Sequence, residues 1–491
     1  MDMTPPKILS DLQKRNIVVG VLVAMMLASL DQTVVAPALP TIGAALGDTD
    51  FLSWIVSAYL LTGTAVTPLY GKFSDIHGRR PALFLAIGVF LVGSVVCALA
   101  PNMATMIFGR AIQGLGGGGL LALAQTVIAD VAAPRERARY VIYVSMVWAV
   151  SSVAGPIIGG FFAQHLSWSL IFWINLPLGL FAVAITNHTL KQLPQIRRNH
   201  RLDFQGSALL IGATSCLMLL LTLGGVRYAW TSPEMLALAA ATLALALALL
   251  AHLFRAAEPL IPLSIFRNEV VGTATVSMFF SMVAFVGCTV YLPIYLELAI
   301  GKDSTVAGAG LIVLLAGSVV GANTAGRNMP RVVHYKRMAV AGLCVAIAAL
   351  AGLSAFAPRL GFWQVEALVL IMGAGIGTLF PVLTVSVQNA VDPRDLGIGT
   401  ATLAFLRSLG AAIGVAAIGA IVLAFGVVSD VGLAHAGASV DPDLARRAGQ
   451  AFVAVFAVQG VALALSLVFL CLMAERPLRG PAQAPAAVAE I

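Results

Sequence analysis

Residues 110–119 read RAIQGLGGGG, in which Gly114, Gly116 and Gly119 spell a literal G-x-G-x-x-G. That pattern binds a dinucleotide where it follows a β-strand and opens a helix, because its backbone N–H groups then meet the pyrophosphate. Here it lies within an apolar run of helical length at 104–129, and no strand is predicted before it. We therefore interpret the glycines as a helix surface without side chains, which a neighbouring helix or a ligand can approach closely.

The composition indicates a chain solvated mostly by lipid. Of its 491 residues, 59% are hydrophobic and 10% are charged, whereas a soluble domain carries about 25% charged residues. The five cysteines and seven histidines are scattered, so we expect no disulfide framework, no metal site and no cofactor. The net charge of +7 falls in short clusters between apolar runs, which argues against a nucleic-acid-binding surface.

Runs of about 20 apolar residues, long enough to cross a bilayer, predict an all-α integral membrane protein with 14 transmembrane helices. The polar N-terminus lacks the features of a cleaved signal peptide, so the first run is expected to remain as an anchor. Two neighbouring runs are divided at APNMA (100–104). The expected spans are 17–37, 52–70, 82–100, 104–129, 140–163, 168–188, 204–224, 233–254, 270–298, 305–325, 338–356, 362–387, 397–425 and 451–473.

The distribution of cations predicts the orientation. An even number of spans puts both termini on one side of the membrane. If that side is the cytoplasm, its segments hold roughly four times as many Lys and Arg residues as the opposite face, the bias described by the positive-inside rule. We therefore expect both termini in the cytoplasm and the chain in the inner membrane of the cell.

An internal repeat predicts two related halves. GKFSDIHGRRP (71–81) joins spans two and three, and GRNMPRVVHYKRM (326–338) joins spans ten and eleven. Paired six-helix halves, related by a pseudo-twofold axis, are typical of transporters with a substrate site between the halves near the bilayer midplane. The expected organisation is a tail (1–16), a first bundle (17–190), two inserted helices (203–255), a second bundle (270–473) and a final tail (474–491).

Two charges fall deep in the membrane, where each costs roughly 2.5–3.5 kcal/mol on insertion scales. Asp31 in span one and Arg110 in span four both lie about 9 Å from the outer face at 1.5 Å per residue, so we expect them to pair. Gln113 shares a helix face with Arg110 and is expected to join them. A permanent structural pair is one interpretation; we favour a proton site, since moving the arginine away would allow the carboxylate to take up a proton.

Other polar groups are weaker candidates. Arg407 lies around 15 Å from the cytoplasmic end of span thirteen, and contact with substrate, a second coupling role and bonds to carbonyls all stay open. Gln32, Gln113 and Tyr291 are further candidates for lining a substrate cavity. Glu297 and Glu366 lie near span ends, where we expect interfacial solvation.

Two short motifs suggest how the halves move. In GKFSDIHGRRP, Gly71 and Gly78 permit tight backbone, and Asp75 can meet a helix N-terminus of the other half or pair with Arg79 or Arg80. We expect an ionic latch there; the alternative is a solvated loop that only sets topology. In AGPIIGG (154–160), near the outer face, we expect close helix packing; its motif residues are Gly155, Pro156, Gly159 and Gly160.

Taken in order, LDQTVVAPALP, GKFSDIHGRRP, RAIQGLGGGG and AGPIIGG resemble four motifs of the major facilitator superfamily, most closely its fourteen-helix drug:proton antiporters. The resemblance covers essentially the whole chain. It implies the major facilitator fold, proton coupling at Asp31 and Arg110, stabilisation of the outward-open state by Asp75 with Arg79 and Arg80, and antiporter character for Gly155 to Gly160.

The resulting expectation is a secondary exporter, not an enzyme, that expels small hydrophobic compounds in exchange for protons. A same-fold exporter of a lipid or a dedicated metabolite is the alternative. A membrane-embedded enzyme or sensor would need a cluster of catalytic groups or a signalling domain, and neither is visible. The outer segment 426–450 is long enough to contact a periplasmic adaptor.

Overall fold

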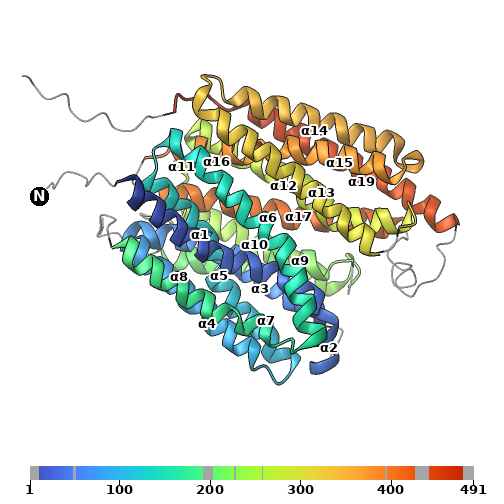
Figure 1. The fold of residues 1–491 in the computed structure, drawn as a ribbon, viewed down its shortest axis with the longest axis horizontal. Coiled ribbons are helices and arrows are strands. Elements are labelled where there is room, and N and C mark those ends of the chain that lie inside the picture. The colour runs from blue at the N-terminus through green and yellow to red at the C-terminus, as the bar shows by residue number, and fades with distance from the viewer. Residues whose placement is uncertain are drawn as a thin grey trace, which may run out of the picture.

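The computed structural model describes residues 10–47, 51–191, 203–225, 228–256, 258–302, 304–392, 395–425 and 442–478. These form two helical bundles side by side, with the earlier helices in one and the later helices in the other (Figure 1). Of the segment expected to contact an adaptor, residues 426–441 lie outside the described residues.

The first bundle contains six long segments, one of which is broken. They are α1 (Asp11–Val34), α3 (Leu52–His77), α4 (Arg79–Ala98), α5 (Met103–Val131), α6 (Pro134–His165) and the pair α7 (Leu170–Trp173) and α8 (Asn175–Leu190). The turn η1 (Ala36–Ala38) and the short helix α2 (Leu39–Leu46) follow α1.

The second bundle repeats this pattern after two further helices, α9 (Phe204–Leu223) and α10 (Pro233–Arg255). A short helix, α11 (Ser264–Arg267), leads into it. Its segments are α12 (Glu269–Leu298), α13 (Ser304–Asn328), α14 (Lys336–Phe356), the pair α15 (Phe362–Gly377) and α16 (Leu379–Ala390), α17 (Leu396–Ala424) and α19 (Pro442–Leu472), with the turns η3 (Met329–Arg331) and η4 (Ala357–Arg359) beside α14.

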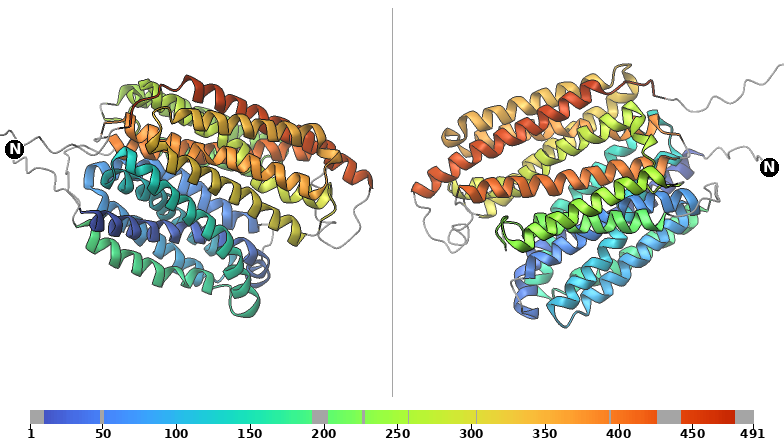
Figure 2. Two further views of the ribbon diagram at one scale, coloured as in Figure 1. Left: turned by 45° about the horizontal axis from the view of Figure 1, so that its top comes forward. Right: turned by 180° about the vertical axis from the view of Figure 1, so that it is seen from behind.

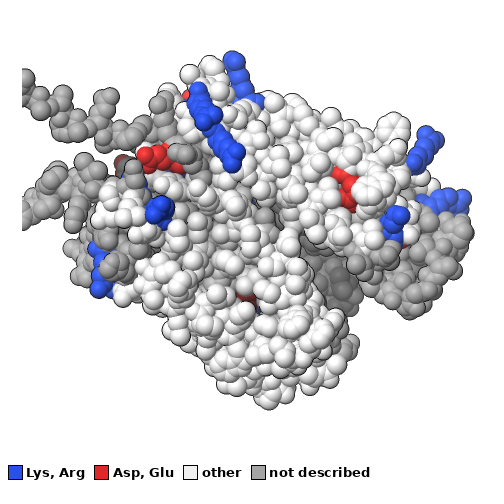
Figure 3. Space-filling view, in the orientation of Figure 1, with Lys and Arg blue, Asp and Glu red and all other residues white. Residues whose placement is uncertain are grey.

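Thirteen helices in the described part of the chain are long and apolar enough to cross a membrane. The remaining expected span, 52–70, corresponds to α3, whose 26 residues include Pro68 and several threonines and glycines that lower its hydropathy. Most of the face in Figure 3 is free of charged side chains, as lipid contact requires. The division at APNMA is confirmed, because α4 ends at Ala98 and α5 begins at Met103.

Two spans expected to be continuous are broken instead. The first ends as α7 at Trp173 and resumes as α8, and the second ends as α15 at Gly377 and resumes as α16. Each break comes four residues before a proline, Pro177 or Pro381. Proline has no N–H for the bond to the carbonyl four residues earlier, and its ring crowds that carbonyl, so the helix is interrupted there.

Both described chain ends lie at one end of the bundles, called here the terminal end. Lys14 of α1 pairs with Glu136 at the start of α6 at 3.1 Å. Asn389 at the end of α16 donates to the carbonyl of Pro477 at 3.1 Å. The start of α6 and the end of α16 are themselves in contact through Arg137, which donates to the carbonyl of Gln388.

The two inserted helices lie on one flank of the seam between the bundles, and Figure 2 shows them from behind. Helix α9 packs against α3 and α17, one from each bundle, while α10 packs against α9. Asp203 fixes this pair by accepting from His252 Nε2 at 2.8 Å and from the amides of Gly206 and Leu260 at 2.8 and 3.1 Å. Partial burial opposes ionisation of Asp203, but these donors outweigh it and lower the pKa of the carboxyl.

The glycine run of α5 lets neighbouring backbones approach, as the sequence suggested. A Cβ at Gly114 or Gly118 would fall within 3.0 Å of the α3 backbone, and one at Gly116 would meet the α4 backbone equally closely. Helices α3, α4 and α5 therefore pack with little side-chain volume between them, which brings polar groups on all three within reach of one another.

Replacing Gly118 with Val is expected to destabilise the protein by about 1–3 kcal/mol or more, because the new side chain would overlap the carbonyl of Gly63. Thermal unfolding in detergent, followed by size-exclusion chromatography of heated samples, measures the effect. Gly88→Val in α4 is the control, since nothing lies within 4 Å of a Cβ there. Equal melting temperatures for the two variants would contradict the packing role of the glycine run.

Candidate functional site

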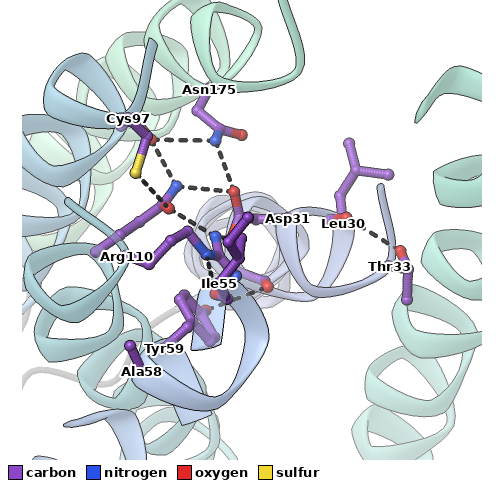
Figure 4. Close-up of polar contacts among 12 residues, drawn as sticks. Leu30, Asp31, Thr33, Ile55, Ala58, Tyr59, Cys97, Arg110 and Asn175 are labelled. Carbon is purple, nitrogen blue, oxygen red and sulfur yellow. Dashed lines mark hydrogen bonds and ion pairs between the residues drawn. The ribbon is translucent and has the colours of Figure 1, made fainter. Parts of the chain in front are cut away.

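A buried ion pair lies inside the first bundle, near the end opposite the termini (Figure 4). Arg110 Nη1 of α5 donates to Asp31 Oδ2 of α1 at 2.6 Å, and the two side chains are 1% and 0% exposed. The expected pairing is therefore present. Both charges are removed from water, so the pair persists only because its geometry is close and its remaining polar atoms are satisfied.

Three donors converge on the carboxylate of Asp31. In addition to Arg110, Gln113 Nε2 and Asn175 Nδ2 donate to Asp31 Oδ1 at 2.7 and 3.0 Å. The same two amides also donate to Ser94 Oγ. An arrangement of donors alone suits an ionised carboxylate, because a protonated acid needs an acceptor for its own O–H.

The guanidinium of Arg110 is held from several sides. Its Nε donates to the carbonyl of Ile55 at 2.9 Å, and Nη1 also donates to Gln113 Oε1 at 2.7 Å. The ring of Tyr59 lies 4.4 Å from the guanidinium carbon, a cation–π contact. The charge is thus fixed in place rather than free to swing.

Several of these partners were not predicted from the sequence. Ser94, Asn175 and Tyr59 stand as single polar or aromatic residues in apolar runs, which was the available signal. Spacing along one helix does not show that five segments, α1, α3, α4, α5 and α8, converge on one point. The carbonyl of Ile55 offers no sequence signal at all.

The opposite face of α1 packs on α6. Thr33 Oγ1 donates to the carbonyl of Ser151 at 2.7 Å, and Ser29 Oγ lies 2.8 Å from Ser151 Oγ. A Cβ at Gly155 or Gly159 would overlap Thr33 or Val34, so these two glycines permit the contact.

Two residues of the AGPIIGG motif do not share this packing. Pro156 is exposed, and nothing lies within 4 Å of a Cβ at Gly160. Residues 156 and 160 lie on a helix face turned away from α1, so the close packing of α1 on α6 is made at Gly155 and Gly159.

The GKFSDIHGRRP motif joins the two bundles at the terminal end. Asp75 Oδ1 and Oδ2 accept from the amides of Gly397 and Ile398 at 3.2 and 2.9 Å, in the first turn of α17. A carboxylate there satisfies free N–H groups and complements the helix dipole. A Cβ at Gly71 would fall within 3.0 Å of α17, so Gly71 permits the approach. Gly78 has φ +93°, in the left-handed region that glycine tolerates.

The two arginines of the motif have different partners. Arg79 Nη1 donates to Asp75 Oδ1 at 2.5 Å, and Arg79 Nε donates to Asp130 Oδ2 at 2.6 Å. Arg80 instead donates to Asn187 of α8, within the first bundle. Of the two pairings considered for Asp75, the one with Arg79 is present.

A second contact between the bundles is made by a base, where the first is made by the acid Asp75. Arg137 of α6 is 9% exposed and donates to the carbonyl of Gln388, in the last turn of α16, at 3.1 Å. The N-terminal end of α17 therefore receives an acid and the C-terminal end of α16 receives a base, both from the first bundle. Each charge has the sign that its helix end favours. Nothing in the sequence distinguished Arg137 from the other cations at that end of the bundles.

Comparison with known proteins shows the family. A sequence model of the Major Facilitator Superfamily matches residues 21–415. The chain belongs to this superfamily. Multidrug resistance protein 3 of Bacillus subtilis is 31% identical over 421 residues, which cover 86% of this chain and 81% of that protein. The efflux pump dotC of Dothistroma septosporum is 33% identical over 422 residues, covering 85% and 72%.

Solved structures agree on the fold. A bacterial homologue of the iron transporter ferroportin has a TM-score of 0.64 at 11% identity, with 94% of this chain and 98% of that chain covered. The proton:xylose symporter XylE has a TM-score of 0.63 at 13% identity, with 94% and 96% covered. The expected major facilitator fold is confirmed, and the protein is a multi-pass membrane transporter rather than an enzyme.

The remaining candidates for the transporter's substrate site do not form one cluster. Arg407 of α17 is half-buried beside the rings of Trp148 of α6 and Phe380 of α16, at 5.7 and 6.0 Å. Tyr291 donates to the carbonyl of Val415 at 3.2 Å and so serves the packing of α12 on α17. Gln32 is half-buried next to Asp31. Gln113 belongs to the ion-pair network rather than to the seam between the bundles.

Glu366 differs from its expected environment. It is 4% exposed, and neither carboxylate oxygen has a hydrogen-bond partner among the described residues. The expectation of interfacial solvation is wrong, because α12 and α13 cover the start of α15 on the side where Glu366 lies.

Proposed function

We propose that the protein exports small hydrophobic, drug-like compounds in exchange for protons, by alternating access between its two bundles. The observation that carries this proposal is the buried Asp31–Arg110 pair, in which the carboxyl group of Asp31 is held by three donors. The relatives named for multidrug resistance and efflux support the class of substrate.

Protonation of Asp31 is the central step. A proton from outside would convert the carboxylate to a neutral acid, and the attraction to Arg110 would fall. The new O–H would also face donors, so the amide of Gln113 would have to turn its oxygen toward Asp31. The network thus has two distinct arrangements, one for each protonation state, as a coupling device requires.

Helix α1 connects this step to the seam. It contacts α5 through Asp31 and α6 through Thr33 and Ser29. Helix α6 in turn carries Arg137, which bonds to α16 of the second bundle, and Trp148, which lies beside Arg407. A shift of α1 on protonation would therefore reach groups that touch the other bundle.

The conformation described here is closed at the terminal end, through the contacts of Asp75 and Arg137. The excess of Lys and Arg in the segments at that end supports its assignment to the cytoplasm. In this assignment the structure represents a state closed to the cytoplasm, in which protons would arrive from the opposite side.

The substrate would bind between the bundles near Arg407, Trp148 and Phe380. At 11 residues from the start of α17, Arg407 lies about 16 Å along the helix. No acid contacts its guanidinium among the described residues, so the site favours compounds with aromatic surface and a neutral or acidic group over dications. A periplasmic adaptor that binds segment 426–450 on the outer face is the proposed protein partner.

Reconstitution in liposomes tests the proposal. A lipophilic fluorophore is added to proteoliposomes containing a trapped pH indicator, and substrate movement and proton movement are recorded together. We expect an imposed proton gradient to drive substrate across the membrane in the direction opposite to proton flow. Nigericin, which collapses the gradient, is expected to abolish both movements. Transport that is unaffected by collapse of the gradient contradicts proton coupling. Strong preference for one lipid or metabolite in a competition panel would instead favour a dedicated exporter.

A further inference from the structure

Glu366 is a buried acid that the proposed mechanism does not use. It lies in α15, and both of its oxygens are enclosed without a donor among the described residues. Asp31, by contrast, has three donors. An ionised carboxylate without donors or a cation is strongly disfavoured in an apolar interior, so the neutral acid is the form that this environment accepts.

The surroundings of Glu366 leave room for a carboxyl and provide no charge to balance it. A Cβ at Gly310 of α13 would lie 2.5 Å from Glu366 Oε1, so the absence of a side chain there makes the space. The side chain of Leu296 from α12 lines the same space. Cys288 of α12, 2% exposed, is a titratable group within electrostatic range of Glu366. From α13 and α14, no charged group among the described residues influences it.

The position of Glu366 mirrors that of the ion pair in the first bundle. Arg110 lies seven residues into α5, the fourth segment of the first bundle, and Glu366 lies four residues into α15, the start of the fourth segment of the second. Both are therefore within about 6–11 Å of the end opposite the termini. Arg110 pairs with α1, the first helix of its bundle, and the space that holds the Glu366 carboxyl is bordered by Gly310 of α13 and by Leu296 of α12, the first helix of the second bundle.

We propose that Glu366 is a second proton-binding site of this transporter, occupied in the conformation closed at the terminal end. The O–H bond forms when the carboxylate takes a proton from water at the opposite end. It breaks when rearrangement of the second bundle brings water or a donor to the oxygens, and the proton then passes to water. The binding of this proton stands on the geometry of Glu366 alone; its place in the export cycle rests on the proposed function.

This proton has a definite effect on the conformational equilibrium. The enclosed state binds it, and a state in which Glu366 is hydrated releases it. Raising the pH therefore lowers the population of the enclosed state. Glu366→Gln imitates the neutral acid, so the population of its enclosed state is expected not to fall as the pH rises.

Infrared difference spectroscopy of the intact protein tests the site directly. A protonated carboxylic acid gives a carbonyl-stretch band that shifts in deuterium oxide. We expect this band at neutral pH in the wild type and in Glu269→Gln, a control at an exposed carboxyl of α12, and its loss in Glu366→Gln. A band of equal intensity in Glu366→Gln, or its absence from the wild type, overturns the proposal. Because Gln matches the shape of the neutral acid, Glu366→Gln is expected to fold.

The number of protons exchanged tests its role in the cycle. We expect the ratio of protons to substrate in proteoliposomes to be lower by one in Glu366→Gln than in Glu269→Gln, while the coupling that depends on Asp31 is retained. An unchanged ratio removes Glu366 from the cycle. If even the wild type shows no substrate-linked proton flow, the proposed function fails, while the infrared band still decides whether Glu366 binds a proton.

Discussion

Proteoliposomes containing Asp31→Asn are expected to lose proton-driven export by about 100-fold or more, which corresponds to about 2.7 kcal/mol at 1.36 kcal/mol per tenfold change. The asparagine side chain cannot take up or release a proton at physiological pH. Its amide also places an NH₂ group against the donors Gln113 and Asn175, which in the wild-type protein bond to a carboxylate oxygen. Removal of one partner from a buried ion pair costs roughly 3–5 kcal/mol in stability, so folding must be checked separately.

Substrate exchange without net proton movement separates coupling from folding. We expect Asp31→Asn to retain exchange of labelled for unlabelled substrate while its response to a proton gradient is lost, and Asp31→Glu to regain part of that response. The double variant Asp31→Asn with Arg110→Gln is expected to be more stable than Arg110→Gln alone, because no unpaired charge is left in the bundle. Normal gradient-driven export by Asp31→Asn would falsify the assignment of Asp31 as the coupling group.

Asp75→Asn is expected to open the terminal end and to reduce export by about tenfold. The substitution removes a charge that satisfies the first-turn amides of α17 and pairs with Arg79. A charge at a helix terminus contributes about 0.3–2 kcal/mol depending on burial, and the lost ion pair adds to that effect. The population closed at the terminal end should therefore fall relative to other states.

Spin labels report this shift directly. A pair at His77 and Val333, exposed residues of the two bundles near the terminal end, should show longer distances in Asp75→Asn. Arg80→Gln is the matched control, because Arg80 belongs to the same motif but bonds to Asn187 within the first bundle. The latch is excluded if Asp75→Asn and Arg80→Gln give the same distance distributions.

Depth in the membrane was the part of the site that the sequence predicted well. The rise of a helix is fixed and the bilayer sets where each span begins, so the equal depth of Asp31 and Arg110 followed from counting residues. Their opposite charges then made pairing the natural expectation, and the structure shows it at 2.6 Å. The turn between α4 and α5 was predictable for a similar reason, since Pro101 and Asn102 interrupt one apolar run.

Lateral neighbours were not predictable from one sequence. Counting places Asn175 and Glu366 at a depth but does not say which helices surround them. Asn175 completes the donor set of Asp31, whereas Glu366 meets no donor among the described residues. The same limit applies to Arg137, whose partner is a backbone carbonyl 251 residues away in sequence.

The inserted helices make the two flanks of the seam unequal. On one flank, α9 and α10 stand between the bilayer and the contact of α3 with α17; on the other, α6 and α13 meet without a helix of that pair packed over them in the described part of the chain (Figure 2). A compound dissolved in the acyl chains meets one side of the seam covered by α9 and α10 and one side without them. We therefore expect any sideways entry from the membrane at the side where α6 meets α13. A twelve-helix relative without this pair would present both sides alike.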